Sequence, residues 1–201
     1  MGVAPNDVRA TKAEAMKKRV LVPLAPGFEE VEALTPVDFL RRADVHVVTA
    51  SVGAPNPITG RNRVRVMADI DLDEALAEWG DDWDAVVIPG GAPGVERLLA
   101  SDTVLALVAR RLQAKQLTAA ICAGPRVLVK AGLAAGTKVT SNPDARAELG
   151  AMDYSEDAVV IDGAVITSRG PGTANAFALA LVEALCGADK AAEIRKKTVS
   201  A

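Results

Sequence analysis

The amino-acid sequence predicts an open α/β sandwich, in which a mainly parallel sheet carries helices on both faces. Short apolar runs, each long enough for a buried strand, alternate with segments of helical pattern through most of the 201 residues. Half of the residues are hydrophobic and only 3% are aromatic, so we expect an aliphatic core. The length suits one sizeable core, and we therefore expect a single domain over residues 19–201 after an N-terminal extension at 1–18.

The predicted elements follow one another along the chain in a regular order. In the first half, strands are predicted at 19–24, 45–50, 64–68 and 84–91, and a short amphipathic helix at 72–79. In the second half, strands are predicted at 117–121, 138–140 and in a 159–167 hairpin, and helices at 95–99, 103–115, 126–130, 174–186 and 189–197. Because open α/β sheets bind ligands beyond the carboxyl ends of their strands, we expect the turns after strands 19–24, 84–91, 117–121 and 138–140 to converge on one site.

Cys122 lies between a buried strand and the start of a helix, next to the chain break at Gly124–Pro125. Backbone N–H groups at such a sharp turn, together with a helix N-terminus, favour a thiolate. The pattern has the geometry of a nucleophile elbow with Cys in the place of Ser. A small buried cysteine that only packs at the strand end explains it equally well. Cys186, within the apolar helix, is expected to be buried and unreactive.

Three glutamates follow the first strand, at the beginning of a predicted helix. Acids in the first turns complement the helix dipole, so solvation is the expected state of Glu29 and Glu30. Glu32 differs because it shares a helical face with Thr35 and Phe39. A buried glutamate tends to be neutral, and a neutral carboxyl can donate a hydrogen bond to a neighbouring thiolate.

Composition argues against several classes of function. The net charge of −3, with acids and bases interspersed, disfavours a nucleic-acid surface and a basic membrane patch. Two separated cysteines and a single histidine, His46, make a metal site unexpected, and His46 inside a strand is interpreted as structural. No apolar leader is visible in 1–18, and 174–186 is too short to span a bilayer, so we expect a cytoplasmic protein.

Four segments resemble the signatures of the ThiJ/PfpI superfamily, specifically its Parkinson's-disease-protein branch. They occur in order and with compatible spacing, from residue 18 to the C-terminus: Gly27–Phe28–Glu29–Glu30–Val31–Glu32, Ile88–Pro89–Gly90–Gly91, Ala119–Ala120–Ile121–Cys122–Ala123–Gly124–Pro125 and Thr167–Ser168–Arg169–Gly170–Pro171–Gly172–Thr173. The resemblance implies a flavodoxin-like fold, a homodimer and no cofactor.

The resemblance also implies a site. Cys122 would be the reactive group, and Glu32 would keep its proton and donate it to the sulfur. The amides of Gly91 and Ala123 would form an oxyanion site. The same region would supply substrate-binding positions, namely Gly90, Asn142, Ser168 and Arg169. Implied activities are glyoxalase conversion of methylglyoxal to lactate and deglycase action on glycated adducts, while oxidation of the cysteine to a sulfinate would serve a redox-responsive or chaperone role.

Two positions depart from the family pattern. Asn142 stands where some members of the branch carry a histidine, and asparagine cannot exchange protons at neutral pH. Ala123 stands where the protease-like branch has a histidine after the nucleophile, which disfavours a peptidase. An amidotransferase is disfavoured because its late His/Glu pair is missing. Two hypotheses therefore remain: an enzyme that acts on small reactive aldehydes, and a redox-responsive protein without obligatory turnover.

Overall fold

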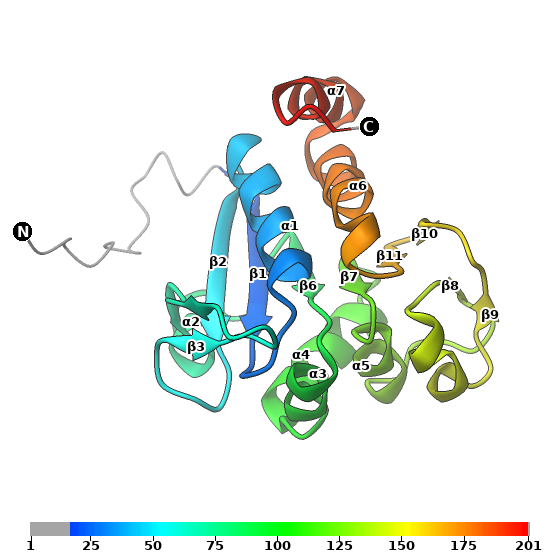
Figure 1. Cartoon of the computed structure of the whole chain (residues 1–201). Helices are drawn as coiled ribbons and strands as arrows, with labels where there is room; N and C mark the ends of the chain where they lie inside the picture. The colour runs from blue at the N-terminus through cyan, green and yellow to red at the C-terminus, as the bar shows by residue number, and fades with distance from the viewer. Residues whose placement is uncertain (1–16, 201) are drawn as a thin grey trace, which may run out of the picture.

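A seven-stranded sheet forms the centre of the protein in the computed structural model, which describes residues 17–200 (Figure 1). The strand order is β10 (Val159–Asp162), β11 (Val165–Ser168), β7 (Thr118–Ile121), β6 (Ala85–Ile88), β1 (Arg19–Leu24), β2 (His46–Ser51) and β5 (Ile70–Asp71). Every neighbouring pair is parallel except the β10–β11 hairpin. The predicted open α/β sandwich is confirmed. Most of the predicted extension lies outside the described residues; Lys18, at its end, already pairs with Asp84.

Helices cover both faces of this sheet (Figure 1). One face carries α1 (Glu30–Arg42), α6 (Ala174–Cys186) and α7 (Ala188–Lys197), and the other carries α2 (Leu72–Trp79), α3 (Ala92–Leu99), α4 (Asp102–Gln113) and α5 (Pro125–Lys130). Side chains alternate across each strand, so that Val20 and Val22 join the core under α1 and α6 while Leu21 joins the opposite core. Within the described part of the chain, no helix has the length and apolar character to cross a membrane.

The edges of the fold differ from the prediction. The expected strand at 64–68 is only β4 (Arg65–Val66), which pairs with β3 (Ile58–Thr59) outside the main sheet, and the edge strand β5 was not expected. The strand predicted at 138–140 is β8 (Lys138–Val139), paired with β9 (Asp153–Tyr154) in a small separate sheet. Two-residue strands are too short to show a period of two, so their pairing is fixed by tertiary contacts.

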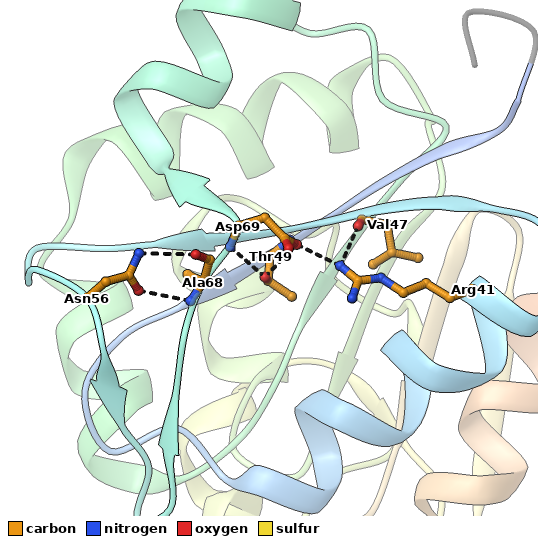
Figure 2. Close-up of polar contacts among 6 residues, drawn as sticks. All are labelled: Arg41, Val47, Thr49, Asn56, Ala68 and Asp69. Carbon is orange, nitrogen blue, oxygen red and sulfur yellow. Dashed lines mark hydrogen bonds and ion pairs between the residues drawn. The ribbon is translucent and has the colours of Figure 1, made fainter. Parts of the chain in front are cut away.

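Polar contacts fasten the segment between β2 and β5 to the sheet (Figure 2). Asn56 and Ala68 exchange two hydrogen bonds of 3.1 and 2.9 Å, which close the base of the segment. The Asp69 carboxylate accepts from the Thr49 hydroxyl at 2.7 Å and from Arg41 of α1 at 2.6 Å. These contacts hold the segment to β2 and to the end of α1, while the N–H groups of Asn62 and Val64 tie it to Glu30 at the start of α1, near the candidate site.

Candidate active site

Cys122 occupies a sharp turn between β7 and α5, as the sequence predicts. Its φ of +65° lies in the left-handed region, which a non-glycine residue adopts only under local constraint. Its N–H donates to the Ser168 carbonyl at 2.9 Å, and its own carbonyl accepts from the Asn142 N–H at 3.0 Å. The turn is therefore held from both sides. Cys122 is buried, but 8% of its surface still reaches solvent.

Glu32 meets Cys122 over a position without a side chain, Gly90. A Cβ placed on Gly90 would lie 2.2 Å from Glu32 Oε2 and 2.6 Å from Cys122 Cβ. A Cβ on Gly170 would lie 3.9 Å from Glu32 Oε1, so Gly170 borders the same carboxyl on its other side. Glu32 is fully buried, and neither carboxyl oxygen has a well-aligned hydrogen-bond partner within residues 17–200.

The turn after β1 packs directly on the turn after β6, and this contact brings Gly91 to the site. The Glu29 N–H donates to the Gly90 carbonyl at 2.9 Å, and a Cβ on Gly91 would lie 2.5 Å from Gly27 O. Gly91 also has a φ of +89°, which glycine tolerates at no steric cost. The amides of Gly91 and Ala123 lower the pKa of Cys122 and so favour its ionised form.

The two titratable groups at the centre perturb each other. Burial raises the pKa of Glu32 to about 7, and the charge of Glu29 adds to this rise. Burial raises the pKa of Cys122 to about 12, with the charge of Glu32 as the second cause, while the amides of Ala123 and Gly91 lower it. This direction is opposite to the favoured thiolate that the sequence led us to expect, because burial and the carboxylate outweigh the two amides.

The proton on Glu32 therefore decides the state of Cys122. A carboxylate repels a thiolate, whereas a protonated carboxyl adds no charge and can donate to the sulfur. The pair loses its first proton with an apparent pKa of about 7, and the thiol, whose pKa is raised to about 12, then holds most of the remaining proton. The reactive arrangement is the one in which the proton sits on Glu32 and the charge on the sulfur.

Glu29 and Glu30 are both 7% exposed, so the prediction that they are solvated is wrong. Glu29 caps α1 by accepting from the Glu32 N–H at 2.8 Å. Glu30 accepts from the N–H groups of Asn62 and Val64, at 2.8 and 3.2 Å. Burial raises the pKa of Glu30, but these donors outweigh it and the net pKa is lowered. The sequence could not reveal this role because the partners come from a loop more than thirty residues away.

Asn142 borders the site and also has a structural task. Its Oδ1 accepts from the Asp144 N–H at 3.1 Å and so caps the short helix η2 (Pro143–Leu149). A Cβ on Gly170 would lie 3.8 Å from Asn142 Nδ2, so the amide nitrogen is near the glycine that borders Glu32. The capping role was not expected from the sequence.

Ser168 and Arg169 support the elbow from the next strand. The Ser168 hydroxyl donates to Ala158 O at 2.8 Å and contacts the Thr173 hydroxyl at 2.7 Å. The Arg169 guanidinium donates to Glu156 O at 2.9 Å. The Ser168 carbonyl contacts Cys122, so these two residues hold the loop around the elbow. Their expected role in substrate binding stays a prediction.

Other candidates lie elsewhere or were missed. His46 begins β2, at the end of the sheet away from Cys122, and its ring lies 6.2 Å from that of Trp79. Cys186 was expected to be buried. It is only half-buried, because it is the last residue of α6.

One residue near the site was not predicted from the sequence. The exposed Arg61 donates its backbone N–H to the Phe28 carbonyl, and its charge lowers the pKa of Glu32. Residues 17–200 contain no group of three or more His, Cys, Asp or Glu side chains that could hold a metal ion.

Comparison with known proteins gives the family. Residues 18–184 match the DJ-1/PfpI family over most of the chain. The chain belongs to this family. Parkinson disease protein 7 homolog of Danio rerio is 42% identical over 181 residues, covering 89% of this chain and 95% of that protein. The crystal structure of Drosophila melanogaster DJ-1beta superposes with a TM-score of 0.87 at 39% identity, covering 92% of this chain and all of that one.

A further family member carries an activity in its name. Glutathione-independent glyoxalase DJR-1.2 of Caenorhabditis elegans is 34% identical over 185 residues, covering 90% of this chain and 96% of that protein. The flavodoxin-like α/β fold and the branch that the four sequence motifs indicate are thus confirmed.

Proposed function

We propose that this protein is a cysteine-dependent enzyme that needs no cofactor and acts on small reactive aldehydes, with conversion of methylglyoxal to lactate as its defining reaction. The observation that carries the proposal is the meeting of the buried Glu32 carboxyl with Cys122 over Gly90, beside the amides of Gly91 and Ala123. The glyoxalase name of the nematode relative supports the same reaction. Glycated adducts of such aldehydes are the alternative substrates.

The proposed chemistry begins with attack of the Cys122 thiolate on the aldehyde carbon, which forms a carbon–sulfur bond. The carbonyl oxygen becomes an oxyanion, which the two amides stabilise before it takes a proton from Glu32. Glu32 then takes the C1 proton of the resulting hemithioacetal and delivers it to the C2 oxygen, which gives an enediol. It next takes the proton of the C1 hydroxyl and protonates C2, giving the lactate thioester. Water hydrolyses the thioester, releasing lactate and the thiol, so that the overall reaction adds one water to methylglyoxal.

Glu32 carries every proton transfer in this scheme, because Asn142 cannot exchange protons. Its pKa of about 7 suits that task, since a group that is half protonated near neutral pH both gives and accepts protons. Asn142 Nδ2 is available to orient the ketone oxygen of the substrate. A single acid/base group implies slower turnover than in a site with a second titratable residue.

The test is lactate formation from methylglyoxal by the wild-type protein and by Cys122→Ser. We expect the wild type to release many molecules of lactate per protein and the serine variant to release at least about 100-fold less, because serine is a far weaker nucleophile than cysteine. Cys186→Ser, which changes the half-buried thiol at the end of α6, should match the wild type. Lactate release limited to one molecule per Cys122, or equal release by Cys122→Ser, would contradict the proposal.

The second candidate is a redox-responsive protein whose Cys122 is oxidised to a sulfinate. Asn142, at the position where some members of the branch carry a histidine, favours it because asparagine cannot exchange protons, whereas the two amides and a protonated Glu32 can also bind sulfinate oxygens. Stoichiometric oxidation of Cys122 without lactate turnover would support this function over the enzyme.

We also propose that the protein acts as a homodimer. Val31, Val64 and Met67 are 48, 50 and 66% exposed, and the Val64 N–H donates to Glu30, the neighbour of Val31. Val31 adjoins Glu32 in α1, and Val64 and Met67 belong to the segment that contacts Glu30, so we infer that they form one exposed apolar surface near the candidate site, which a second copy of the chain would cover. We expect sedimentation to give twice the mass of one chain, and Val31→Arg combined with Met67→Arg to give the monomer. A monomeric wild type would contradict the proposal.

A further inference from the structure

Arg126 connects the three turns that surround Cys122. It is the second residue of α5 and lies four positions after Cys122. Its NH1 pairs with Glu96 Oε1 at 2.8 Å, and its NH2 pairs with Glu148 Oε2 at 2.5 Å. The side chain of Arg126 is only 13% exposed, whereas those of its two partners are 61 and 52% exposed. The arginine therefore lies between the helices, and the carboxylates reach it from the surface.

Each partner belongs to an element that begins at the candidate site. Glu96 lies on α3, which starts directly after Gly91, and the Val95 N–H donates to the Gly91 carbonyl at 2.9 Å. Glu148 lies on η2, which Asn142 caps. Arg126 itself donates through its backbone N–H to the Ala123 carbonyl at 3.2 Å. The two ion pairs thus join the helices that follow Gly91, Cys122–Ala123 and Asn142.

We propose that Arg126 is a positioning residue, whose paired contacts with Glu96 and Glu148 hold the Gly91, Cys122 and Asn142 turns in register and so sustain the reactivity of Cys122. The inference rests on the proposed role of Cys122 as the reacting group. Arginine suits this task because its planar guanidinium binds two carboxylates at once, whereas the lysine ammonium is a compact point charge. Removal of the arginine leaves two unpaired carboxylates on neighbouring elements, which then repel each other.

The chain offers a matched control. Arg110 of α4 makes a bidentate pair with Asp81, at 2.8 Å for each contact, and both side chains are about half exposed. This ion pair joins α4 to the segment before β6 and contacts none of the three turns. Exposed surface pairs of this kind contribute little to stability, so its loss should leave the fold intact.

The experiment measures the rate of iodoacetamide labelling at Cys122 as a function of pH, with Cys186→Ser in every protein so that one thiol reports. We expect Arg126→Met to lower the labelling rate near neutral pH about tenfold, because small displacements of positioned groups have large kinetic effects. Arg126→Lys should recover part of the rate, and Arg110→Met should equal the parent protein. Thermal unfolding of each variant shows that the assay temperature leaves it folded.

Glu96→Gln and Glu148→Gln keep the proposal testable if Arg126→Met does not fold. In the protein that keeps Arg126, each should lower the labelling rate by about threefold, because each removes one of the two ion pairs that join Arg126 to the neighbouring helices. Equal labelling by the Arg126→Met, Arg110→Met and parent proteins, or unchanged labelling in both glutamine variants, would overturn the proposal. Labelling does not require turnover. A wild type that releases no lactate would therefore refute the enzymatic function, while the labelling rates of the variants would still test the role of Arg126.

Discussion

Replacement of Gly90 by alanine should make Cys122 nearly unreactive. The new methyl group would lie 2.2 Å from Glu32 Oε2, 2.6 Å from Cys122 Cβ and 3.0 Å from the Ile121 carbonyl. The glutamate can move aside, but the backbone of β7 and the Cys122 Cβ cannot move without opening the elbow. We expect Gly90→Ala to lower lactate release about 100-fold and to slow iodoacetamide labelling of Cys122, because carboxyl and thiol no longer meet.

Gly172→Ala is the control for this substitution. Gly172 comes from the same glycine-rich set of motifs, but no atom lies within 4 Å of its added Cβ, and its φ is outside the left-handed region. The variant should keep the turnover and the labelling rate of the wild type. Full activity in Gly90→Ala would show that the contact between Glu32 and Cys122 is not needed.

Substitution of Glu32 should separate the hydrogen bond from the proton transfer. Glu32→Gln keeps a donor of nearly the same shape, whereas Glu32→Asp withdraws the carboxyl by one methylene. Labelling of Cys122 near neutral pH should therefore survive better in Glu32→Gln than in Glu32→Asp. Turnover should fall about 100-fold or more in both, since glutamine cannot pass a proton and aspartate does not reach. Unchanged turnover in both variants would remove Glu32 from the mechanism.

The pH dependence of the free energy of unfolding gives an independent test of the state of the Glu32 carboxyl. Its pKa rises from 4.5 to about 7 on folding, so the folded state resists ionisation of Glu32. This shift costs the folded state about 3 kcal/mol, a penalty that is absent below pH 4.5, grows as the pH rises toward 7 and is complete above it. Glu32→Gln has no such penalty. The variant should therefore gain stability over the wild type as the pH is raised from about 5 to about 8 in denaturant unfolding.

The sequence was sufficient for those features that are encoded locally. Buried strands such as 19–24 and 117–121 are short, mostly apolar runs, and the elbow at Cys122 is marked by the change from such a run to Gly124–Pro125. The hairpin at β10–β11 follows from its Asp162–Gly163 turn. These elements were predicted because each is specified within a few residues of itself.

Features that depend on distant partners could not be predicted in this way. In the sequence Glu30 looks like a solvated acid, because the Asn62 and Val64 N–H groups that it binds are more than thirty residues away. Arg126 looks like a surface cation, because its partners Glu96 and Glu148 lie on other helices. The raised pKa of Cys122 likewise arises from burial and from the charge of Glu32, a residue ninety positions earlier. The sequence places these groups on elements, but only the packing of the elements decides their state.

The pH–rate profile of iodoacetamide labelling tests the central claim, that Glu32 and Cys122 share one proton, most directly. In the wild type, the rate should rise with pH up to about 7 and then level off, because the pair has by then lost its first proton and the remaining one divides between carboxyl and thiol in a ratio that does not depend on pH. In Glu32→Gln, the rate should continue to rise past that point, since no carboxylate appears. A wild-type profile that passes pH 7 without a break and coincides with that of Glu32→Gln would contradict the account.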